Sequence, residues 1–201
     1  MLLGMMGSRV ACAQDMLKGV DLEQPAYSQA ELTRADIEKA IINHSNGTSL
    51  DFSRKSLNGL DLSGLNLSGC NFYAARMNKT DLSNANLEGA ILDQAWLIEA
   101  NLTNATLKGA HAFAAQMQRI RADKANFSNI RLTADLTGAS LRETLFNEAD
   151  LSADMKNQSM GLMRAILRSA RLEGSSFTKA NLMSVDLSFA HATHANFMEA
   201  N

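Results

Sequence analysis

Between residues 85 and 110 the chain repeats with a period of five residues. An alanine stands two residues before each leucine of this repeat. The leucines are Leu87, Leu92, Leu97, Leu102 and Leu107. A helix returns a side chain to the same face about every 3.6 residues and a strand about every two, so neither explains a strict period of five. The spacing indicates a regular structure of another kind, built from five-residue units.

The period covers most of the sequence. Stepping by five residues from Phe52 to Leu107 gives twelve central positions, and all of them are Leu, Phe or Met. Eight of the nine residues that stand two positions earlier, between Ala75 and Ala115, are alanine. Asp or Asn often precedes the central residue, and Ser or Thr often follows it. With only 5% aromatic residues, the chain is suited to a narrow core of small and medium side chains.

The unit A-(N/D)-(L/F)-(S/T)-x, repeated over residues 50–201, resembles the signature of the pentapeptide repeat family. The resemblance implies an all-β solenoid, a right-handed quadrilateral parallel β-helix, in which each unit forms one side and four units form one coil. It also implies that the central residue points into the bore and that the small residue lies inside a corner. The structural core is then expected to contain Phe52, Leu62, Phe72, Leu82, Leu87, Leu92, Leu97, Leu102, Leu107 and Phe127.

The composition of the repeat agrees physically with this architecture. A corner every five residues needs a compact side chain inside it, which accounts for the alanines. Coils stacked as parallel strands satisfy one another's backbone hydrogen bonds, so the fold grows in one direction. Asp and Asn are residues that bond local backbone groups in turns, which suits their place before each central residue.

A helix is expected immediately before the repeats. Ser28 and Glu31 fit an S-x-x-E capping box, and Gly47 fits a stop after the helix. Four apolar residues fall near one face, namely Leu32, Ile37, Ala40 and Ile41. We expect an amphipathic helix at about residues 29–46. Because one such helix is not stable alone, we expect it to cap the repeat domain of residues 48–201.

The chain before this helix has two parts. Residues 1–14 have a short apolar start and a small-residue triplet at 11–13 that is typical of a signal-peptidase site, whereas residues 15–47 lead into the helix. Against a secretory signal, Arg9 interrupts the apolar part and no basic residue precedes it. We expect a clipped signal segment and a periplasmic or secreted protein, with a cytoplasmic protein as the alternative. No segment has the length that a membrane span needs.

The repeat departs from its rule in the second half of the chain. Ala112 and Ala122 replace central leucines, and we expect Phe113 to fill part of the first gap. After Leu132 the register slips by one residue, and it returns at Leu162. The central residues in between are Leu136, Leu141, Phe146 and Leu151. Breaks in a strict repeat are where a scaffold acquires function, so these residues are of most interest.

Residues 152–161 show no clean repeat, and we expect an irregular loop that projects from the solenoid. This segment and its flank carry methionines and basic residues: Met155, Lys156, Met160, Met163, Arg164, Arg168 and Arg171. Clustered thioethers are suitable Cu(I) ligands, but flexible apolar side chains also patch irregular packing or contact partners. Together with Trp96, which faces outward, these residues are our candidate interaction surface. A plain solvated face is the alternative.

No metal, cofactor or catalytic site is expected. His191 and His194 point outward from different parts of one side, and His111, in the column of His191, lies four coils away. The two cysteines, Cys12 and Cys70, are too few for a disulfide framework or a zinc site. The sequence has neither a phosphate-binding loop nor a nucleophile with a placed histidine and acid. An enzyme is therefore not expected.

The charge balance limits the kind of partner. The net charge of −2 provides no basic stripe for nucleic acid. We therefore expect a non-enzymatic interaction scaffold for an unknown protein partner. Some pentapeptide repeat proteins modulate DNA gyrase by imitating duplex DNA, but residues 48–201 contain fifteen acidic and fifteen basic residues, which disfavours a polyanion mimic. A third alternative is a periplasmic copper-binding protein that uses the loop methionines.

The repeat continues to Asn201, the last residue of the sequence, and no capping helix follows. An open end of a β-helix exposes core side chains and strand edges. We expect either an end-to-end homodimer through the C-terminal coil or a truncated chain.

Overall fold

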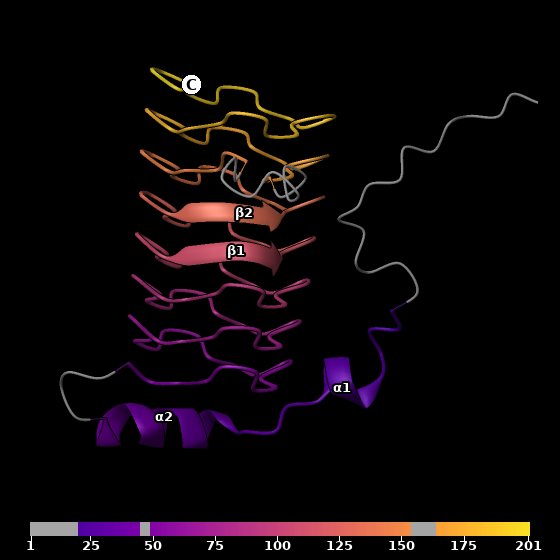
Figure 1. The fold of residues 1–201 in the computed structure, drawn as a ribbon, viewed down its shortest axis with the longest axis vertical. Coiled ribbons are helices and arrows are strands. Elements are labelled where there is room, and N and C mark those ends of the chain that lie inside the picture. Colours follow the sequence, from indigo (N-terminus) through magenta and orange to yellow (C-terminus); the bar gives the residue numbers. More distant parts are fainter. Residues whose placement is uncertain (1–19, 45–48, 154–163) are drawn as a thin grey trace, which may run out of the picture.

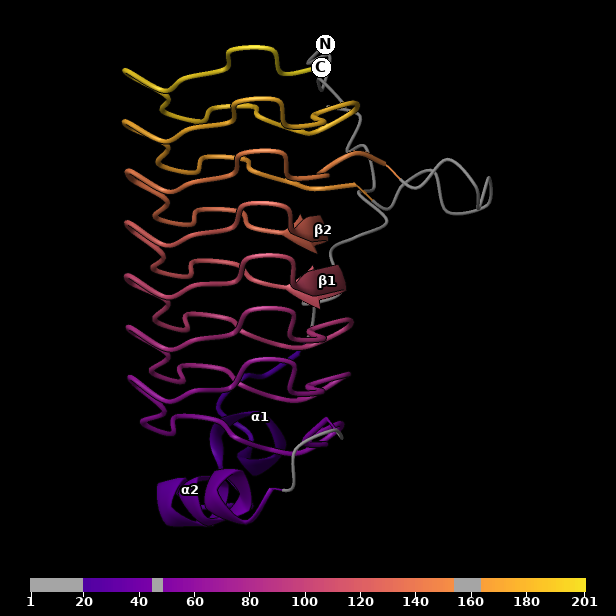
Figure 2. The same cartoon turned by 90° about the vertical axis from the view of Figure 1, so that its left-hand side faces the viewer.

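The computed structural model describes residues 20–44, 49–153 and 164–201. It contains two helices, α1 (Pro25–Ser28) and α2 (Arg34–Asn43), and two strands, β1 (His111–Gln116) and β2 (Arg131–Asp135). The remaining chain forms a stack of coils that rises from α2 to the C-terminus (Figure 1). Successive coils repeat the same outline when the stack is turned by 90° (Figure 2).

Four columns of parallel backbone bridges hold the coils together, and each column defines one face of the solenoid. Face 1 contains Asp51, Asn71, Ile91, His111, Arg131, Asp150 and Asn181. Face 2 contains Ser56, Arg76, Trp96, Gln116, Asp135, Ile166 and Asp186. Face 3 contains Asp61, Asp81, Asn101, Arg121, Ser140, Arg171 and His191. Face 4 contains Asn66, Asn86, Thr106, Asn126, Leu145, Ser176 and Asn196. The expected period of four units per coil is therefore present.

The bore is filled by the central residues of the repeat. Phe52 is 5% exposed, and the other nine residues named above as the structural core are 0% exposed. Phenylalanines stack along the column of face 4, with ring centroids 5.0 Å apart for Phe127 and Phe146 and 4.8 Å apart for Phe146 and Phe177. Cys70 lies in a corner, where burial raises the pKa of its thiol to about 11. The thiol therefore stays protonated, as a small apolar side chain.

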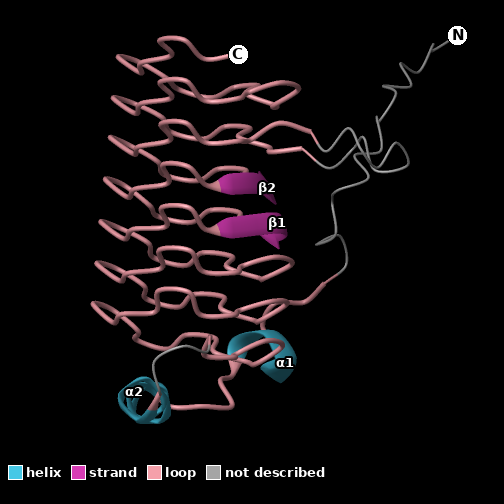
Figure 3. Cartoon of the chain, turned by 60° about the vertical axis from the view of Figure 1, so that its left-hand side comes forward, coloured by secondary structure: helices cyan, strands magenta, loops and turns pink. Residues whose placement is uncertain are grey.

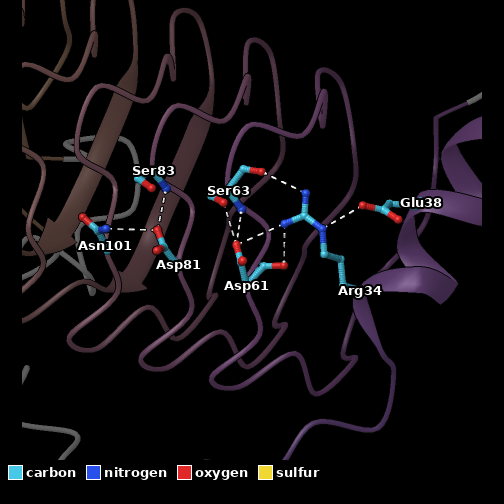
Figure 4. Close-up of polar contacts among 7 residues, drawn as sticks. All are labelled: Arg34, Glu38, Asp61, Ser63, Asp81, Ser83 and Asn101. Carbon is cyan, nitrogen blue, oxygen red and sulfur yellow. Dashed lines mark hydrogen bonds and ion pairs between the residues drawn. The ribbon is translucent and has the colours of Figure 1, made fainter.

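Each side of a coil ends in a turn that is fixed by the residue before the central one. On face 3, the Asp81 carboxylate accepts a hydrogen bond from the Ser83 backbone N–H at 2.9 Å and another from the Asn101 side-chain amide at 3.0 Å (Figure 4). The first bond closes the local turn, and the second joins one coil to the next. This arrangement explains the preference for Asp and Asn at that position.

Helix α2 begins later than the sequence suggested. Its N-cap is Thr33, which forms a reciprocal capping box with Asp36, so the capping box expected at Ser28 and Glu31 is wrong. Ser28 instead ends α1, where its hydroxyl donates to the Glu23 and Gln24 carbonyl oxygens at 3.1 and 3.0 Å. The hydrogen bonds from Thr33 lower the pKa of the Asp36 carboxyl. The expected stop at Gly47 lies outside the described residues.

Helix α2 lies at the first coil and contacts it through the apolar residues Ile37, Ala40 and Ile41 and the basic residue Arg34. Ile37 is 1% exposed and belongs to the core cluster. Arg34 donates to the Asp61 carboxylate at 3.0 Å and to the Ser63 carbonyl at 3.2 Å, and it pairs with Glu38 at 2.7 Å (Figure 4). The apolar face of the helix thus packs on the first coil, but the helix is shorter than the expected range of residues 29–46.

The register slip after Leu132 is visible in the bridges. Arg121 pairs with Ser140, and Arg131 pairs with Asp150, so this coil is one residue shorter than its neighbours. All four central residues predicted for the slipped register are 0% exposed. The predicted return at Leu162 lies outside the described residues, and Leu167 is the next described residue in the bore.

Within residues 20–44, 49–153 and 164–201, only β1 and β2 are continuous strands, and they are neighbours on successive coils (Figure 3). Both run around the corner from face 1 to face 2, where other coils make isolated bridges on each side of a sharp turn. Ala112 and Ala122 occupy the bore and are 0% exposed. Phe113 does not fill the gap at Ala112: it is half-buried on the outer surface, because side chains alternate along a strand.

Candidate interaction surface

The corner where β1 and β2 lie side by side carries a hollow on face 1. The cavity measures about 200 Å³ and is lined by Asp93, His111, Phe113 and Arg131. The two strands pair in parallel, with His111 beside Arg131 and Phe113 beside Thr133, and the register becomes irregular between Phe113 and Gln116. The hollow therefore lies where the regular corner is replaced by continuous strand.

The residues of the hollow come from three successive coils. The Asp93 carboxylate accepts the backbone N–H of Phe113 at 2.8 Å, a bond that fixes the carboxylate beside the ring. His111 and Arg131 are exposed and stand one coil apart on the same column. Among the described residues, Arg131 has no ion-pair partner. The hollow thus offers a cation, a carboxylate, an imidazole and an aromatic ring within one concave surface.

Buried polar atoms without partners lie next to this corner. Thr133, in β2, is 3% exposed, and its hydroxyl oxygen finds no hydrogen-bond partner in the described part of the chain. The Gln118 side chain donates to Gln116 at 3.0 Å and to Asp135 at 2.9 Å, but its own oxygen is unpaired in that same part. Each unpaired polar group costs free energy, and two of the four buried side-chain atoms without a hydrogen-bond partner among the described residues lie here, the other two being on Arg76 and Glu173.

The basic residues of the predicted interaction surface that the structure describes lie on different faces. Arg168 lies on face 2 and pairs with Asp186 at 2.8 Å, whereas Arg171 lies on face 3 between Ser140 and His191. Arg164 is half-buried near the start of the coil that follows the insertion. The other four members lie outside the described residues: Met155, Lys156, Met160 and Met163.

Trp96 lies on face 2 but is only half-exposed. Its ring stacks on that of Tyr27, with centroids 5.1 Å apart and an interplanar angle of 20°. Tyr27 belongs to α1, so an N-terminal segment of the same chain covers the outward-facing tryptophan. In the free protein, Trp96 makes an intramolecular contact.

Sequence reasoning did not single out the hollow. His111 was placed in the column of His191, but His111 lies on face 1 and His191 on face 3. The error arises because the shortened coil and the inserted segment together shift later residues by half a coil. A usable signal was present in Asp93 and Phe113, which occupy the position after the central residue where Ser or Thr is common.

Some of the charged side chains elsewhere on the solenoid pair with a charge of opposite sign on the adjacent coil. Arg119 pairs with Glu99 at 3.0 Å, and Arg142 pairs with Glu173 at 3.4 Å. Weaker pairs at 3.9 Å join Lys124 to Glu143 and Lys179 to Glu199. These pairs leave no single-sign stripe along the coils that they connect.

Two further properties concern ligands and membranes. Across residues 20–44, 49–153 and 164–201, no group of three or more His, Cys, Asp or Glu side chains is placed to hold a metal ion. No helix within those ranges combines the length and hydrophobicity that crossing a bilayer requires.

The last coil presents apolar side chains to solvent. Phe197 stacks on Phe177 at 5.0 Å but remains 39% exposed. Met183, Phe189 and Met198 are 49%, 80% and 57% exposed. Four of the seven exposed large hydrophobic residues in the described parts of the chain therefore lie in the final coil.

Comparison with solved structures finds other repeat proteins. HetL from the cyanobacterium Nostoc sp. strain PCC 7120, a pentapeptide repeat protein involved in heterocyst differentiation regulation, is 21% identical. The match covers 85% of this chain and 94% of HetL, with a TM-score of 0.42. QnrB1, a plasmid-mediated fluoroquinolone resistance protein, is 18% identical over 78% of this chain and 84% of its own, with a TM-score of 0.43.

A third structure, a pentapeptide repeat protein from the Arabidopsis thaliana thylakoid lumen, is 28% identical over 47% of this chain and 67% of its own, with a TM-score of 0.35. No curated protein sequence matches this chain. The family model of pentapeptide repeats matches eight copies, over residues 56–94, 90–129 and 163–201. Proteins of this kind form right-handed β-helices, in agreement with the stacked coils. Because the matched residues make up more than half of its length, this chain belongs to the pentapeptide repeat family.

Proposed function

We propose that this protein is a non-enzymatic scaffold that binds a protein partner at the hollow on face 1. The observation that carries the proposal is the concave, mixed-charge surface of Asp93, His111, Phe113 and Arg131 on face 1. Arginine and aromatic residues are enriched at protein interfaces, and they contribute most when they lie in a pocket.

The neighbourhood of the hollow supports a binding role. Among the described residues neither Arg131 nor Arg121 on face 3 has an ion-pair partner, whereas Arg119 and Arg142 are paired with the adjacent coil. An unpaired exposed cation is available to a carboxylate of a partner, and Asp93 is available to a cation.

A charge reversal tests this proposal. Arg131→Glu places a second acidic group beside Asp93, and we expect the partner captured from the native host by the wild-type protein to be lost. Arg121→Glu, on the regular side of face 3 in the neighbouring coil, is the matched control and should retain it. Loss with both variants, or retention with both, contradicts a site at the hollow.

A topoisomerase-directed DNA mimic remains the alternative function. The ion pairs between coils disfavour it, because paired charges do not reproduce the field of a polyanion. We expect the supercoiling activity of DNA gyrase to be unaffected by an excess of this protein. Inhibition or protection of gyrase would favour the alternative. The copper-binding alternative depends on methionines outside the described residues and gains no support here.

Two structural roles belong to the same proposal. We infer that α2 caps the first coil, supported by the burial of Ile37 and the bonds from Arg34 to Asp61 and Ser63. We also infer that the exposed apolar side chains of the last coil, including Phe197, pair end to end with a second copy. Light scattering that gives only a monomer at micromolar concentration would contradict the dimer.

Export of the protein is a separate proposal. The apolar start and the triplet at 11–13 favour a periplasmic or secreted protein, but these residues lie outside the described part of the chain. Fractionation of the host cells, with mass determination of the mature N-terminus, tests it.

A further inference from the structure

We propose that face 2 of the first three coils is a peptide-binding groove, and that a partner's acidic segment carrying an aromatic residue competes for it with the chain's own N-terminal arm. The N-terminal arm is defined as residues 20–31, and it includes α1. In the structure it lies along the groove, with Tyr27 on Trp96. This inference deepens the scaffold role by naming a second surface and the chemistry of its partner.

The groove recognises the main chain of the arm. Side chains of Ser56 and Asn58 both donate to the carbonyl oxygen of Gln29, the amide at 3.2 Å. The Asn78 amide donates to the carbonyl oxygen of Tyr27 at 3.2 Å. These carbonyls lie at the C-terminal end of α1, where a short helix leaves acceptors without intrahelical partners. Main-chain contacts of this kind tolerate a change of sequence in the bound segment.

The solenoid builds this groove without help from the arm. Asn58 and Asn78 are each 4% exposed and stand one coil apart. The Asn58 side-chain oxygen accepts the backbone N–H of Asn78 at 2.9 Å, and the Asn78 oxygen accepts that of Ile98 at 3.1 Å. The coils therefore fix both amide oxygens inward, which leaves both NH₂ groups pointing toward a ligand. A pre-organised site of this kind lowers the cost of binding.

The arm lies on the surface of the solenoid, and Ala30 makes an isolated backbone bridge with Leu57. None of the arm's residues is buried, whereas the side chains that bond its carbonyl oxygens are. Arg76 lies between Ser56 and Trp96 on face 2, and its Nε atom is buried with no hydrogen-bond partner among the described residues. A ligand that brings an acceptor to Arg76 gains a charge-assisted hydrogen bond that the arm does not make. The arm is thus a replaceable occupant of the groove.

Charge complementarity specifies the ligand. The arm has three acidic residues and no basic one. Two of the acidic residues form exposed ion pairs with the groove: Glu23 with Lys79 at 3.0 Å and Glu31 with Lys55 at 3.0 Å. Since Arg76 adds a third cation, the groove suits an acidic segment. The flat ring of Trp96 suits an aromatic anchor on that segment.

Trp96 is the single tryptophan of the chain, so its fluorescence reports directly on the groove. The probe is a synthetic peptide of residues 20–31, titrated to about 1 mM because a tethered arm competes at a local concentration of that order. In the full-length chain, Tyr27→Ala weakens the binding of the arm to the groove. We expect this variant to bind the peptide about fivefold more tightly than the wild-type protein does. Tyr73→Ala, on face 1, is the matched control and should bind like wild type.

A second set of measurements tests the specificity of the groove. A peptide with both glutamates replaced by lysine should not bind, and Asn78→Ala in the Tyr27→Ala background should reduce binding at least tenfold while circular dichroism remains unchanged. Arg131→Glu should not affect the peptide, which separates this groove from the hollow on face 1. No saturable change in Trp96 fluorescence in wild type or in Tyr27→Ala, or equal binding of the lysine peptide, would overturn the inference.

Discussion

The coils formed by residues 51–110 and the coils formed by residues 111–166 share one bore but differ at the corner between faces 1 and 2. In the first group the chain turns sharply, and each side makes an isolated bridge. In the second group β1 and β2 run around the corner, one coil is shortened, and a segment is inserted before Arg164. The difference shows that the bore continues wherever the inward-facing residues keep their pattern. The outward-facing residues and the corners can therefore differ from coil to coil.

The hollow is a consequence of that freedom. Where the chain turns sharply, Asp and Asn side chains form hydrogen bonds within the turn and to the next coil, as Asp81 does. At β1 the continuous strand places larger side chains on the surface, so Phe113 and His111 line a cavity with Arg131. In the proposed function the regular coils are the scaffold, and the corner between faces 1 and 2 at β1 and β2, here called the relaxed corner, is the binding surface.

The prediction with the largest expected effect concerns whether side chains in the bore are packed equally well in the two groups of coils. Leu102 and Leu141 lie in the same column, before and after the register slip, and both are 0% exposed. We expect Leu102→Ala and Leu141→Ala each to lower the free energy of unfolding by about 2 to 5 kcal/mol, since each leaves a cavity. Urea denaturation measures both. A much smaller loss for Leu141→Ala would mean that the slipped coil is loosely packed, which contradicts a continuous bore.

A second pair compares the turn-forming carboxylates. Asp81→Ala removes bonds to Ser83 and Asn101 in the regular coils, and we expect a loss of about 1 kcal/mol. Asp135→Ala removes bonds from Thr137 and also frees the buried amide of Gln118, so we expect about 2 kcal/mol. Thermal denaturation gives both values. The reverse order would show that the Gln118 network contributes little to the relaxed corner.

The pH dependence of stability tests the coils beyond the insertion. Hydrogen bonds from Ser188 lower the pKa of Asp186 to about 2 from its usual 3.8, and the bond and charge of Arg168 add to this effect. Because the folded pKa is depressed, the stabilisation is present above about pH 4 and is lost as the pH falls toward 2. We expect Asp186→Asn to be less stable than wild type by on the order of 1 kcal/mol at pH 6.

At pH 2 the difference between Asp186→Asn and wild type should have largely disappeared, because the carboxyl of the wild type is then becoming protonated. Urea midpoints between pH 2 and 6 record this convergence. Ser188→Ala should flatten the wild-type pH dependence, since that hydroxyl is the main cause of the shift. A difference that stays constant over this range would show that Asp186 does not titrate with the depressed pKa.

The smallest expected effect concerns the turn residues with positive φ. Ala74, in the regular coils, has φ of 52°, and Ala114, in β1, has φ of 55°. Glycine adopts this region without the steric cost of a Cβ atom, so Ala74→Gly and Ala114→Gly should each stabilise by about 0.5 kcal/mol. Thermal midpoints measure both. Destabilisation by Ala114→Gly alone would show that the corner at β1 has a different backbone requirement in solution.

The fold could be read from the sequence because its period is set by local geometry. One apolar residue per side and one small residue per corner are enough to define the bore, and even the register slip is visible in Leu136 and Leu141. The helix start could not be read reliably, because Ser28 and Thr33 are both good N-cap residues. In the structure Thr33 is the N-cap of α2, and the next residue, Arg34, bonds to Asp61 and Ser63 of the first coil.

The candidate surface was harder to predict than the fold. It depends on which residues from different coils share a face, and an uncounted shift of half a coil moves every later side chain to the opposite face, as it did for His191. The contact between Tyr27 and Trp96 was also hidden, because nothing in a repeat indicates where a segment outside the repeat will lie. The repeat pattern predicts that an outward-facing residue of a solenoid is exposed to solvent. In the folded chain, a segment from outside the repeat can cover such a residue.

The most direct test of the central claim compares two positions on face 1. Phe113 lies at the relaxed corner, and Tyr73 lies two coils earlier on the same side in the regular coils. Each is replaced in turn by the photocross-linking residue p-benzoyl-phenylalanine, and the protein is irradiated in extracts of its native host. We predict one discrete cross-linked partner from the position of Phe113 and none from that of Tyr73. Equal cross-linking from both positions, or a discrete partner from Tyr73 alone, would contradict the assignment of binding to the relaxed corner.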